Sequence, residues 1–358
     1  MNARRRFLAG MLAAGVIPKT GWASAGMPAW LAAAGTQDGG FVLCGITSAR
    51  EIAFRIPIPA RGHAAAAHPT KPHAVAFARR PGTFALVIDC ATGEVRSRLA
   101  SLPGHHFYGH GAFSADGSVL FTSENDYNRA RGMIGVWDAT DGYRRITAFE
   151  SGGIGPHDIK RLSGTDTLVV ANGGIETHPD SGRAKLNLAT MQPNLSYIAE
   201  GQVTETVTLP RDLRLNSIRH LALSKTGTVA FGMQWESAGH PRALVGLHKR
   251  GAEPVLCTAP EHVTREMQGY VGSIAMDNFG ERIAVTSPRG GVVQTYDATT
   301  GNFVSSHPQT DACGVASNGT GFTVTDGTGG IARLGNGSND RRRVDGLMWD
   351  NHLVPVGT

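Results

Sequence analysis

A short pattern of strand, turn and strand recurs along the chain and constrains the fold more than any other feature. One copy begins at His110, turns at residues 115–117 and continues into a second apolar strand. A third strand follows at residues 132–138 and a turn at 139–142. Related copies begin near His63 and Ser273. Short strands separated by Gly, Asp and Pro turns are typical of antiparallel sheets, so the sequence predicts an all-β protein.

The repeating unit also predicts the architecture. The aligned unit starts are His63, His110, His157, His220, Ser273, Gly314 and His352, at spacings between 38 and 63 residues. Seven four-stranded units of this length predict a seven-bladed β-propeller of the YVTN/WD40-like type, with six or eight blades as the alternatives. The last unit is short, so segments 41–47 and 51–58 are expected to complete the last blade together with the C-terminal strand. The longest interval contains an insertion near residues 175–202.

The first 25 residues read as an export signal. Paired arginines, Arg4 and Arg5, precede Phe7-Leu8, an apolar stretch follows at residues 9–17, and small residues 23–25 fit a cleavage site. Such paired arginines are typical of the twin-arginine signal; an ordinary secretory signal or an uncleaved anchor is the alternative. The apolar stretch is shorter than the ~20 residues of a membrane span. We therefore expect a signal peptide at 1–25 and a single periplasmic propeller domain at 26–358, with no membrane span in the mature chain.

Charge and cysteine usage exclude further classes. The chain carries a formal net charge of +5, but the first 25 residues hold four basic residues and no acid. The remaining chain is nearly neutral, which argues against nucleic-acid binding because phosphate contacts need an excess of Lys and Arg on one face. No two of the cysteines form a C-x-x-C motif, and we expect buried free thiols although the periplasm permits disulfides. The four cysteines are Cys44, Cys90, Cys257 and Cys313.

Histidine occupies five of the seven unit starts. In a propeller blade the innermost strand begins on the face where the second strand ends, so unit starts and the loops after second strands meet near the central axis. Imidazole nitrogens suit copper, iron, zinc and nickel. The sequence therefore predicts an axial metal site, with a purely structural use of the histidines as the alternative. The predicted metal ligands are His63, His110, His157, His220 and His352.

Polar residues in the loops after the second strands, or beside the histidines, are candidates for cofactor binding around that site. Neighbouring carboxylates, such as Asp158 and Asp350, are expected to orient imidazoles, and the arginines keep an anionic ligand as an alternative. Six scattered histidines are interpreted as surface or loop residues, namely His105, His106, His178, His240, His248 and His262. The polar insertion at residues 178–188 either caps the funnel or decorates the surface. The predicted cofactor-binding residues are Arg80, Glu124, Asn125, Asn172, Arg219, Gln234, Arg289 and Asp326.

Several segments, taken together, resemble one family. They are residues 109–114, 122–126, 155–159, 170–179, 217–222, 286–291 and 349–352. In these the chain is similar to an uncharacterised family of exported bacterial propellers, a domain of unknown function. Genes of that family often lie beside those of imelysin-type periplasmic iron-uptake proteins and of a di-haem oxidoreductase-like protein. The resemblance implies a context of periplasmic iron acquisition and carries no established activity.

We expect a non-catalytic periplasmic propeller that binds a transition metal, iron in the first place and copper as the alternative, and that assists iron uptake with imelysin-type partners. No nucleophile-elbow or cofactor motif is present in the sequence, which favours binding over catalysis. Two alternatives stay open at this point. One is a metal-dependent periplasmic oxidoreductase or hydrolase that uses the same funnel, and the other is a protein-interaction scaffold whose histidines are structural.

Overall fold

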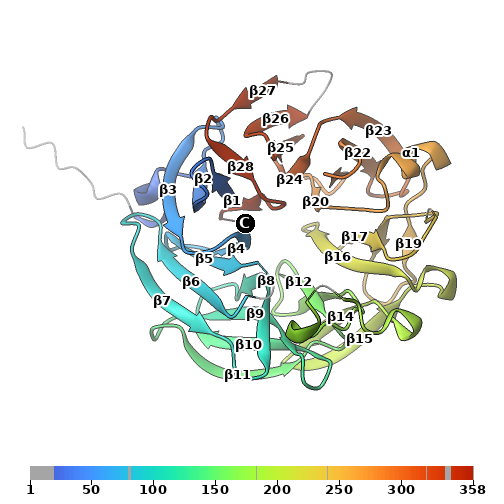
Figure 1. Cartoon of the computed structure of the whole chain (residues 1–358), viewed down its shortest axis with the longest axis horizontal. Coiled ribbons are helices and arrows are strands. Elements are labelled where there is room, and N and C mark those ends of the chain that lie inside the picture. Colours follow the sequence, from blue (N-terminus) through green and yellow to red (C-terminus); the bar gives the residue numbers. More distant parts are fainter. Residues whose placement is uncertain are drawn as a thin grey trace, which may run out of the picture.

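Seven small antiparallel sheets surround a central axis in the computed structural model (Figure 1). The structure describes residues 20–79, 82–182, 184–239, 241–319, 321–334 and 340–357. This arrangement confirms the predicted all-β, seven-bladed propeller. Helices in the described part of the chain are short. They are α1 (Glu261–Glu266) and the 3-10 helices η1 (Gly21–Ala25), η2 (Pro179–Ser181), η3 (Leu188–Thr190) and η4 (Arg211–Leu213).

Six blades are formed by four consecutive strands each, from the axis outward. Blade 1 contains β4 (Gly62–Ala67), β5 (His73–Ala78), β6 (Phe84–Asp89) and β7 (Val95–Ala100). Blade 2 contains β8 (His105–Phe113), β9 (Val119–Asp126), β10 (Arg131–Asp138) and β11 (Arg144–Glu150). Blade 3 contains β12 (Pro156–Arg161), β13 (Leu168–Asn172), β14 (Asn194–Ala199) and β15 (Gln202–Thr208).

The chain continues around the ring in the same way. Blade 4 contains β16 (Asn216–Leu223), β17 (Val229–Trp235), β18 (Val245–His248) and β19 (Val255–Leu256). Blade 5 contains β20 (Ser273–Met276), β21 (Arg282–Ser287), β22 (Val292–Asp297) and β23 (Phe303–Pro308). Blade 6 contains β24 (Ala312–Ser317), β25 (Phe322–Asp326), β26 (Gly330–Leu334) and β27 (Asp340–Arg343).

Blade 7 closes the ring by joining both ends of the described chain. It contains β28 (Leu347–Trp349), β29 (Val354–Pro355), β1 (Trp30–Thr36), β2 (Phe41–Ile46) and β3 (Ile52–Ile58). Both C-terminal strands pair with β1, so they form the innermost position of the blade, and Figure 1 shows β28 beside the N-terminal strands. The predicted closure is therefore confirmed, with β1 as an additional strand that the sequence pattern did not reveal.

The hydrophobic core lies between neighbouring blades. Phe77 of blade 1 packs with Phe107, Leu120 and Trp137 of blade 2 in one buried cluster. A second cluster seals the closure, where Trp30 and Trp349 pack with residues of blade 6. Since β-strands bury alternate side chains against each adjoining sheet, each blade holds its two neighbours in place, and the inner strand ends are fixed relative to one another.

Four further predictions concern the insertion, the N-terminal segment, membrane spans and the cysteines. The connection between β13 and β14 spans residues 173–193, whereas the rest of the segment 175–202 that was predicted as an insertion forms β14 and the start of β15. Residues 1–19, which include the paired arginines, lie outside the described residues. The described chain begins just before η1, where Trp22 donates from Nε1 to the backbone oxygen of His68 at 2.8 Å. No described helix has the length and apolar character that a membrane crossing requires. All four cysteines are buried and free, as predicted.

Candidate metal centre

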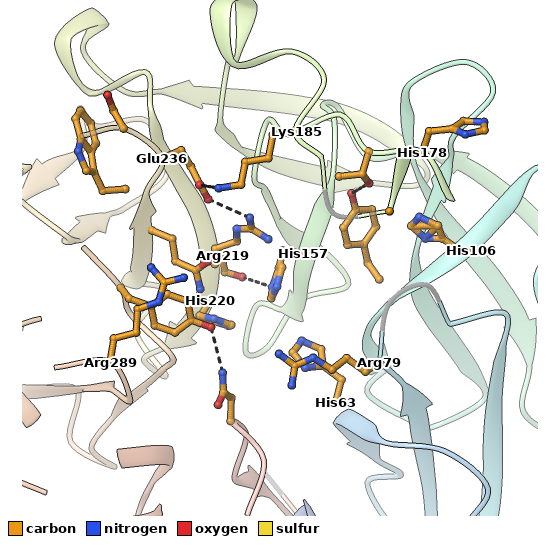
Figure 2. Close-up of a pocket in the computed structure, with 18 of the residues that line it drawn as sticks. His63, Arg79, His106, His157, His178, Lys185, Arg219, His220, Glu236 and Arg289 are labelled. Atoms are coloured by element: carbon orange, nitrogen blue, oxygen red, sulfur yellow. Dashed lines mark hydrogen bonds and ion pairs between the residues drawn. The ribbon is translucent and has the colours of Figure 1, made fainter. Parts of the chain in front are cut away.

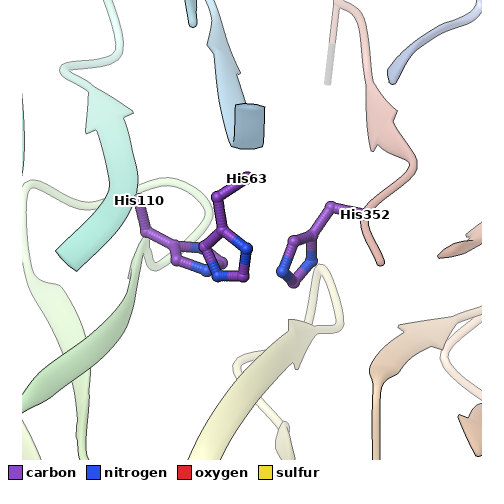
Figure 3. A group of neighbouring side chains, drawn as sticks. All are labelled: His63, His110 and His352. Atoms are coloured by element: carbon purple, nitrogen blue, oxygen red, sulfur yellow. The ribbon is translucent and has the colours of Figure 1, made fainter. Parts of the chain in front are cut away.

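The five histidines at the unit starts converge at the axis. All five are buried, with at most 9% of the residue surface exposed. Ring centroids lie 4.6 Å apart for His63 and His352, 4.7 Å for His110 and His352, and 4.8 Å for His157 and His220. Figure 3 shows His63, His110 and His352 pointing toward one another from three separate strands or loops. The repeat position therefore does bring these side chains into one group, here called the axial cluster.

An irregularity of the innermost strand occurs at every one of these positions. The register of β4, β8, β12 and β16 with the second strand of each blade shifts at or next to the histidine. His352 lies between β28 and β29, where the innermost position of blade 7 is interrupted. A β-bulge bends the strand and turns a side chain out of the regular alternation. The bulges are therefore the local reason why the imidazoles lie at the axis.

A glycine makes room for one of them. Gly109 has φ +97°, and a Cβ at this position would lie 2.6 Å from Cδ2 of His63. Both the backbone conformation and the close contact exclude an ordinary side chain here. The bulge of blade 2 and the imidazole of blade 1 are thus fitted to each other.

Two imidazoles have a defined tautomer because their Nδ1 atoms face acceptors. Nδ1 of His110 lies 3.1 Å from Oδ1 of Asp158, and Nδ1 of His157 lies 3.0 Å from the backbone oxygen of Arg219. A carboxylate and a carbonyl can only accept here, so the neutral form of each ring carries its hydrogen on Nδ1 and presents a lone pair at Nε2. The carboxylate–histidine pair is the arrangement that commonly supports a metal ligand.

Asp158 is itself held firmly. Its side chain accepts from the backbone N–H of Ile159 at 2.8 Å and of Leu221 at 2.9 Å. Burial by itself would raise the pKa of Asp158, but Lys160 and His110 outweigh it and lower the pKa below its usual range. Asp158 is therefore an anion that orients His110. The sequence predicted a supporting carboxylate, but the imidazole that it supports belongs to the neighbouring blade.

Five buried ring nitrogens of the cluster have no hydrogen-bond partner within the described residues. They are Nδ1 of His63, Nε2 of His110, both ring nitrogens of His220, and Nε2 of His352. Two groups place one nitrogen from each residue within 4.8 Å of the others: His63, His110 and His352 in the first, and His110, His157 and His220 in the second. Inward lone pairs and unsatisfied nitrogens are what a bound transition-metal ion requires, so the residues fit such an ion.

Four of the five imidazoles of the axial cluster are kept uncharged by this environment. Burial lowers the pKa of His63, His157 and His352 well below the ordinary value, and neighbouring cationic groups add to the effect. For His220 burial lowers the pKa to about 3, with His110 as the next contribution. Only neutral imidazole binds a metal. The fold thus keeps four of these side chains in the ligand form down to acidic pH.

A cavity of about 750 Å³ opens directly over the cluster. His63, His157 and His220 form part of its wall, and Figure 2 shows these imidazoles with the surrounding polar side chains. The insertion after β13 lines the cavity through His178, Pro179, Gly182 and Lys185. This position agrees with the interpretation of the loop as a cap over the funnel rather than as a surface decoration. A pocket of this size accommodates a small molecule, so the cluster is accessible from one side.

Three of the predicted cofactor-binding residues line the cavity, namely Arg219, Gln234 and Arg289. Asn125 lies behind the wall, where Nδ2 contacts Nε2 of His106 at 3.3 Å and the backbone oxygen of Thr177 at 3.4 Å. Both of these residues line the cavity. Arg80 lies outside the described residues.

The other three predicted residues are held in hydrogen-bond networks of the blades and are not brought to the cavity wall. Glu124 is fully buried and pairs with Arg145 at 2.9 Å. Asn172 bonds with Ser151 and Asn194. Asp326 pairs with Arg341 at 2.9 Å. Successive strand residues face opposite sides of a sheet, so a place near a strand end does not bring every side chain to the axis.

Several lining residues were not singled out by the sequence pattern. His106 and His248, interpreted as surface or loop residues, are both buried, but only His106 lines the cavity. His248 bonds with the Tyr197 hydroxyl at 2.6 Å and with the Ala252 oxygen at 2.8 Å. Lys185, Glu236 and Tyr270 also line the cavity. A signal for Lys185 was present, since it lies in the insertion that was expected either to cap the funnel or to decorate the surface.

Comparisons with known proteins agree with this architecture. Among solved structures, the hydrazine synthase of Kuenenia stuttgartiensis is similar with a TM-score of 0.61 and 12% identity, over 93% of this chain and 99% of that chain. At this identity the similarity concerns the fold alone. No curated protein matches the sequence. The family model described as a protein of unknown function, DUF1513, matches residues 56–356, and the chain therefore belongs to the DUF1513 family.

Proposed function

We propose that this protein is a periplasmic metal-binding propeller that holds a transition-metal ion at the axial cluster, iron in the first place, and assists its uptake. The observation that carries the proposal is the convergence of five buried imidazoles, four of which have a ring nitrogen without a partner among the described residues. Two of them, His110 and His157, already have the tautomer that presents Nε2 to the centre.

The energetic balance supports an ion over a purely structural use. A buried polar group without a partner costs about 1–3 kcal/mol. The five nitrogens without partners in the cluster would then cost on the order of 5–15 kcal/mol, which is as large as the whole stability of an ordinary domain. Solvent in the cavity offsets part of this cost, and a bound ion offsets more of it, because three or more nitrogens are satisfied at once. A structural histidine would instead resemble His248, which has a partner on each ring nitrogen.

The choice of ion rests on the family context and on the donor set. The resemblance to propellers of iron-uptake gene clusters favours iron, and imidazole nitrogens suit iron, copper and zinc alike. The paired arginines and the apolar stretch within residues 1–25 support a periplasmic location, and an imelysin-type protein is the partner that we propose there.

The test is metal analysis of protein exported through its own signal. Metal-free protein is titrated anaerobically with Fe(II), and separately with Cu(I) and Zn(II), and bound metal is counted by elemental analysis. We expect stoichiometric binding in the wild type and none in the double variant His110→Ala/His157→Ala. His248→Ala is the matched control, because it removes a buried histidine outside the cluster. Wild-type protein that retains none of the three ions would refute the proposal.

A metal-dependent enzyme is the second candidate, and one observation favours it. The cavity leaves about 750 Å³ in contact with the cluster, which is space for a substrate rather than for the ion alone. Redox cycling of the loaded protein with small periplasmic reductants, lost in the double variant, would support this function over simple carriage.

A further inference from the structure

The cavity wall contains several positively charged side chains, and a metal site alone does not explain their presence. We propose that this cavity binds a small anion bearing two or more carboxylates, which there serves as a co-ligand of the metal ion. The metal would accordingly arrive as a carboxylate chelate. The part that concerns the metal rests on the function proposed above, whereas anion binding itself does not.

The described lining of the cavity is strongly positive. Its cations are Arg79, Lys185, Arg219 and Arg289, and its one described carboxylate is that of Glu236. Glu236 is 6% exposed in its side chain and pairs with two of these cations, Lys185 and Arg219. Two of the four cations of the lining therefore share this one carboxylate.

The other two cations are not neutralised by partners of their own. Nη1 of Arg79 lies 3.5 Å from Oδ2 of Asp350, but that same oxygen accepts from Nε of Arg61 at 2.6 Å. One carboxylate is therefore shared by two guanidinium groups. Arg289 stacks on Tyr270 at 4.4 Å from the ring centre, and no carboxylate of the described chain pairs with it. Its edge N–H groups stay available as donors.

The positions of these groups define where the anion lies. Figure 2 shows Arg79 and Arg289 extending into the cavity from opposite sides, with His63, His157 and His220 in the same wall. An anion between the two arginines would share the cavity with the imidazoles of His63, His157 and His220, so its remaining carboxylate oxygens could serve an ion held by the axial cluster. Cations gathered in one partly enclosed cavity repel one another, and a bound anion removes that cost.

Carboxylate is the chemistry that this wall recognises best. A guanidinium presents two parallel N–H groups that match the two oxygens of a carboxylate. Amides of Gln234 and Asn351 also line the cavity and can serve uncharged oxygens of the ligand. Carboxylate oxygens are in addition good ligands for ferric and ferrous iron, which imidazole-only coordination would leave with open positions.

The experiment measures the anion and the ion separately. Metal-free wild-type protein is titrated with citrate in a calorimeter, and in parallel with inorganic phosphate. We expect saturable one-to-one citrate binding that tightens once Fe(II) is bound, and weaker phosphate binding. Arg289→Gln is expected to weaken citrate binding about tenfold or more, with Arg289→Lys intermediate. The control Arg131→Gln removes an exposed arginine that pairs with Glu150 on the outer part of blade 2 and should bind citrate as the wild type does.

Three results would overturn the inference: no citrate binding to the metal-free protein, equal binding by Arg289→Gln, or tighter binding of phosphate than of citrate. Fe(II) titration in citrate-free buffer tests the metal site on its own. Citrate binding without metal binding would therefore refute the proposed function but support the anion site. Metal binding without citrate binding would refute the anion site but support the proposed function.

Discussion

Replacing one cluster histidine by an apolar residue should make the metal-free protein more stable. His220 is 3% exposed, and both of its ring nitrogens lack a partner in the described chain. The variant His220→Leu removes both polar groups and keeps a side chain of similar volume. At about 1–3 kcal/mol for each unsatisfied group, we expect the free energy of unfolding to rise by about 2 kcal/mol or more. Urea denaturation of metal-free protein at pH 8 measures the change.

His248→Leu is the matched control for this variant. His248 is buried to the same degree, at 2% exposure, but both of its ring nitrogens are hydrogen-bonded. Its replacement leaves the Tyr197 hydroxyl and the Ala252 oxygen without that partner, so we expect a loss of about 1–3 kcal/mol. With metal at about 100 times the dissociation constant the wild type gains about 2.7 kcal/mol, and His220→Leu should lose its advantage. If both variants destabilise the metal-free protein equally, the reasoning from unsatisfied nitrogens is wrong.

Three further outcomes are expected. Because folding depresses the pKa of His63, His157, His220 and His352, the unfolded chain takes up protons first as the pH falls below about 6.5. The free energy of unfolding of the metal-free protein should then decrease by about 1.4 kcal/mol per pH unit for each such imidazole. For His220 this decrease should continue down toward its pKa of about 3, and above pH 7 these imidazoles should contribute nothing. Urea titrations from pH 8 to 4 measure the slope, and a flat profile would contradict the prediction. Asp158→Asn should weaken ion binding about 10- to 100-fold, because His110 loses the carboxylate that orients it, and an unchanged affinity in a competition titration would count against that role. Burial raises the pKa of Cys44, Cys90 and Cys257 to about 12 and also raises that of Cys313. Iodoacetamide at pH 8 should therefore label none of the four thiols in the folded protein and all four in guanidinium. Mass spectrometry counts the labels.

The architecture was predictable because its signals are local and repeated. Turn residues between short strands recur in every unit, and the recurrence of His63, His110 and His157 at equal intervals marks the innermost strand of each blade. The strand β1 was missed because Trp30–Thr36 bears no such mark and stands directly after the predicted export signal. Its place in the fold is decided by pairing with β28 and β29, which are distant in sequence.

The convergence of the five imidazoles was predictable from the sequence, whereas their surroundings were predictable only in part. The five imidazoles occupy one repeat position, which is visible in the sequence, but the bulges that turn them inward arise from the pairing of two strands. For the same reason nothing in the sequence indicates that Asp158 contacts His110 rather than its neighbour His157. Glu124 and Asp326 illustrate the limit of the loop argument, since their carboxylates pair with arginines of the outermost strand of the same blade instead of reaching the axis.

The distribution of the imidazoles around the ring has a mechanical consequence. They come from blades 7, 1, 2, 3 and 4, whereas blades 5 and 6 present Ser273 and Gly314 at the same repeat position. An ion in the cluster would therefore act as a cross-link across one arc of the propeller, including the seam where β28 and β29 pair with β1. Amide hydrogen exchange should slow on metal loading in β4, β8, β12 and β16 and stay the same in β20 and β24. Ion binding would thus report that the ring has closed, because His352 stands beside His63 only after the last strands have paired with β1.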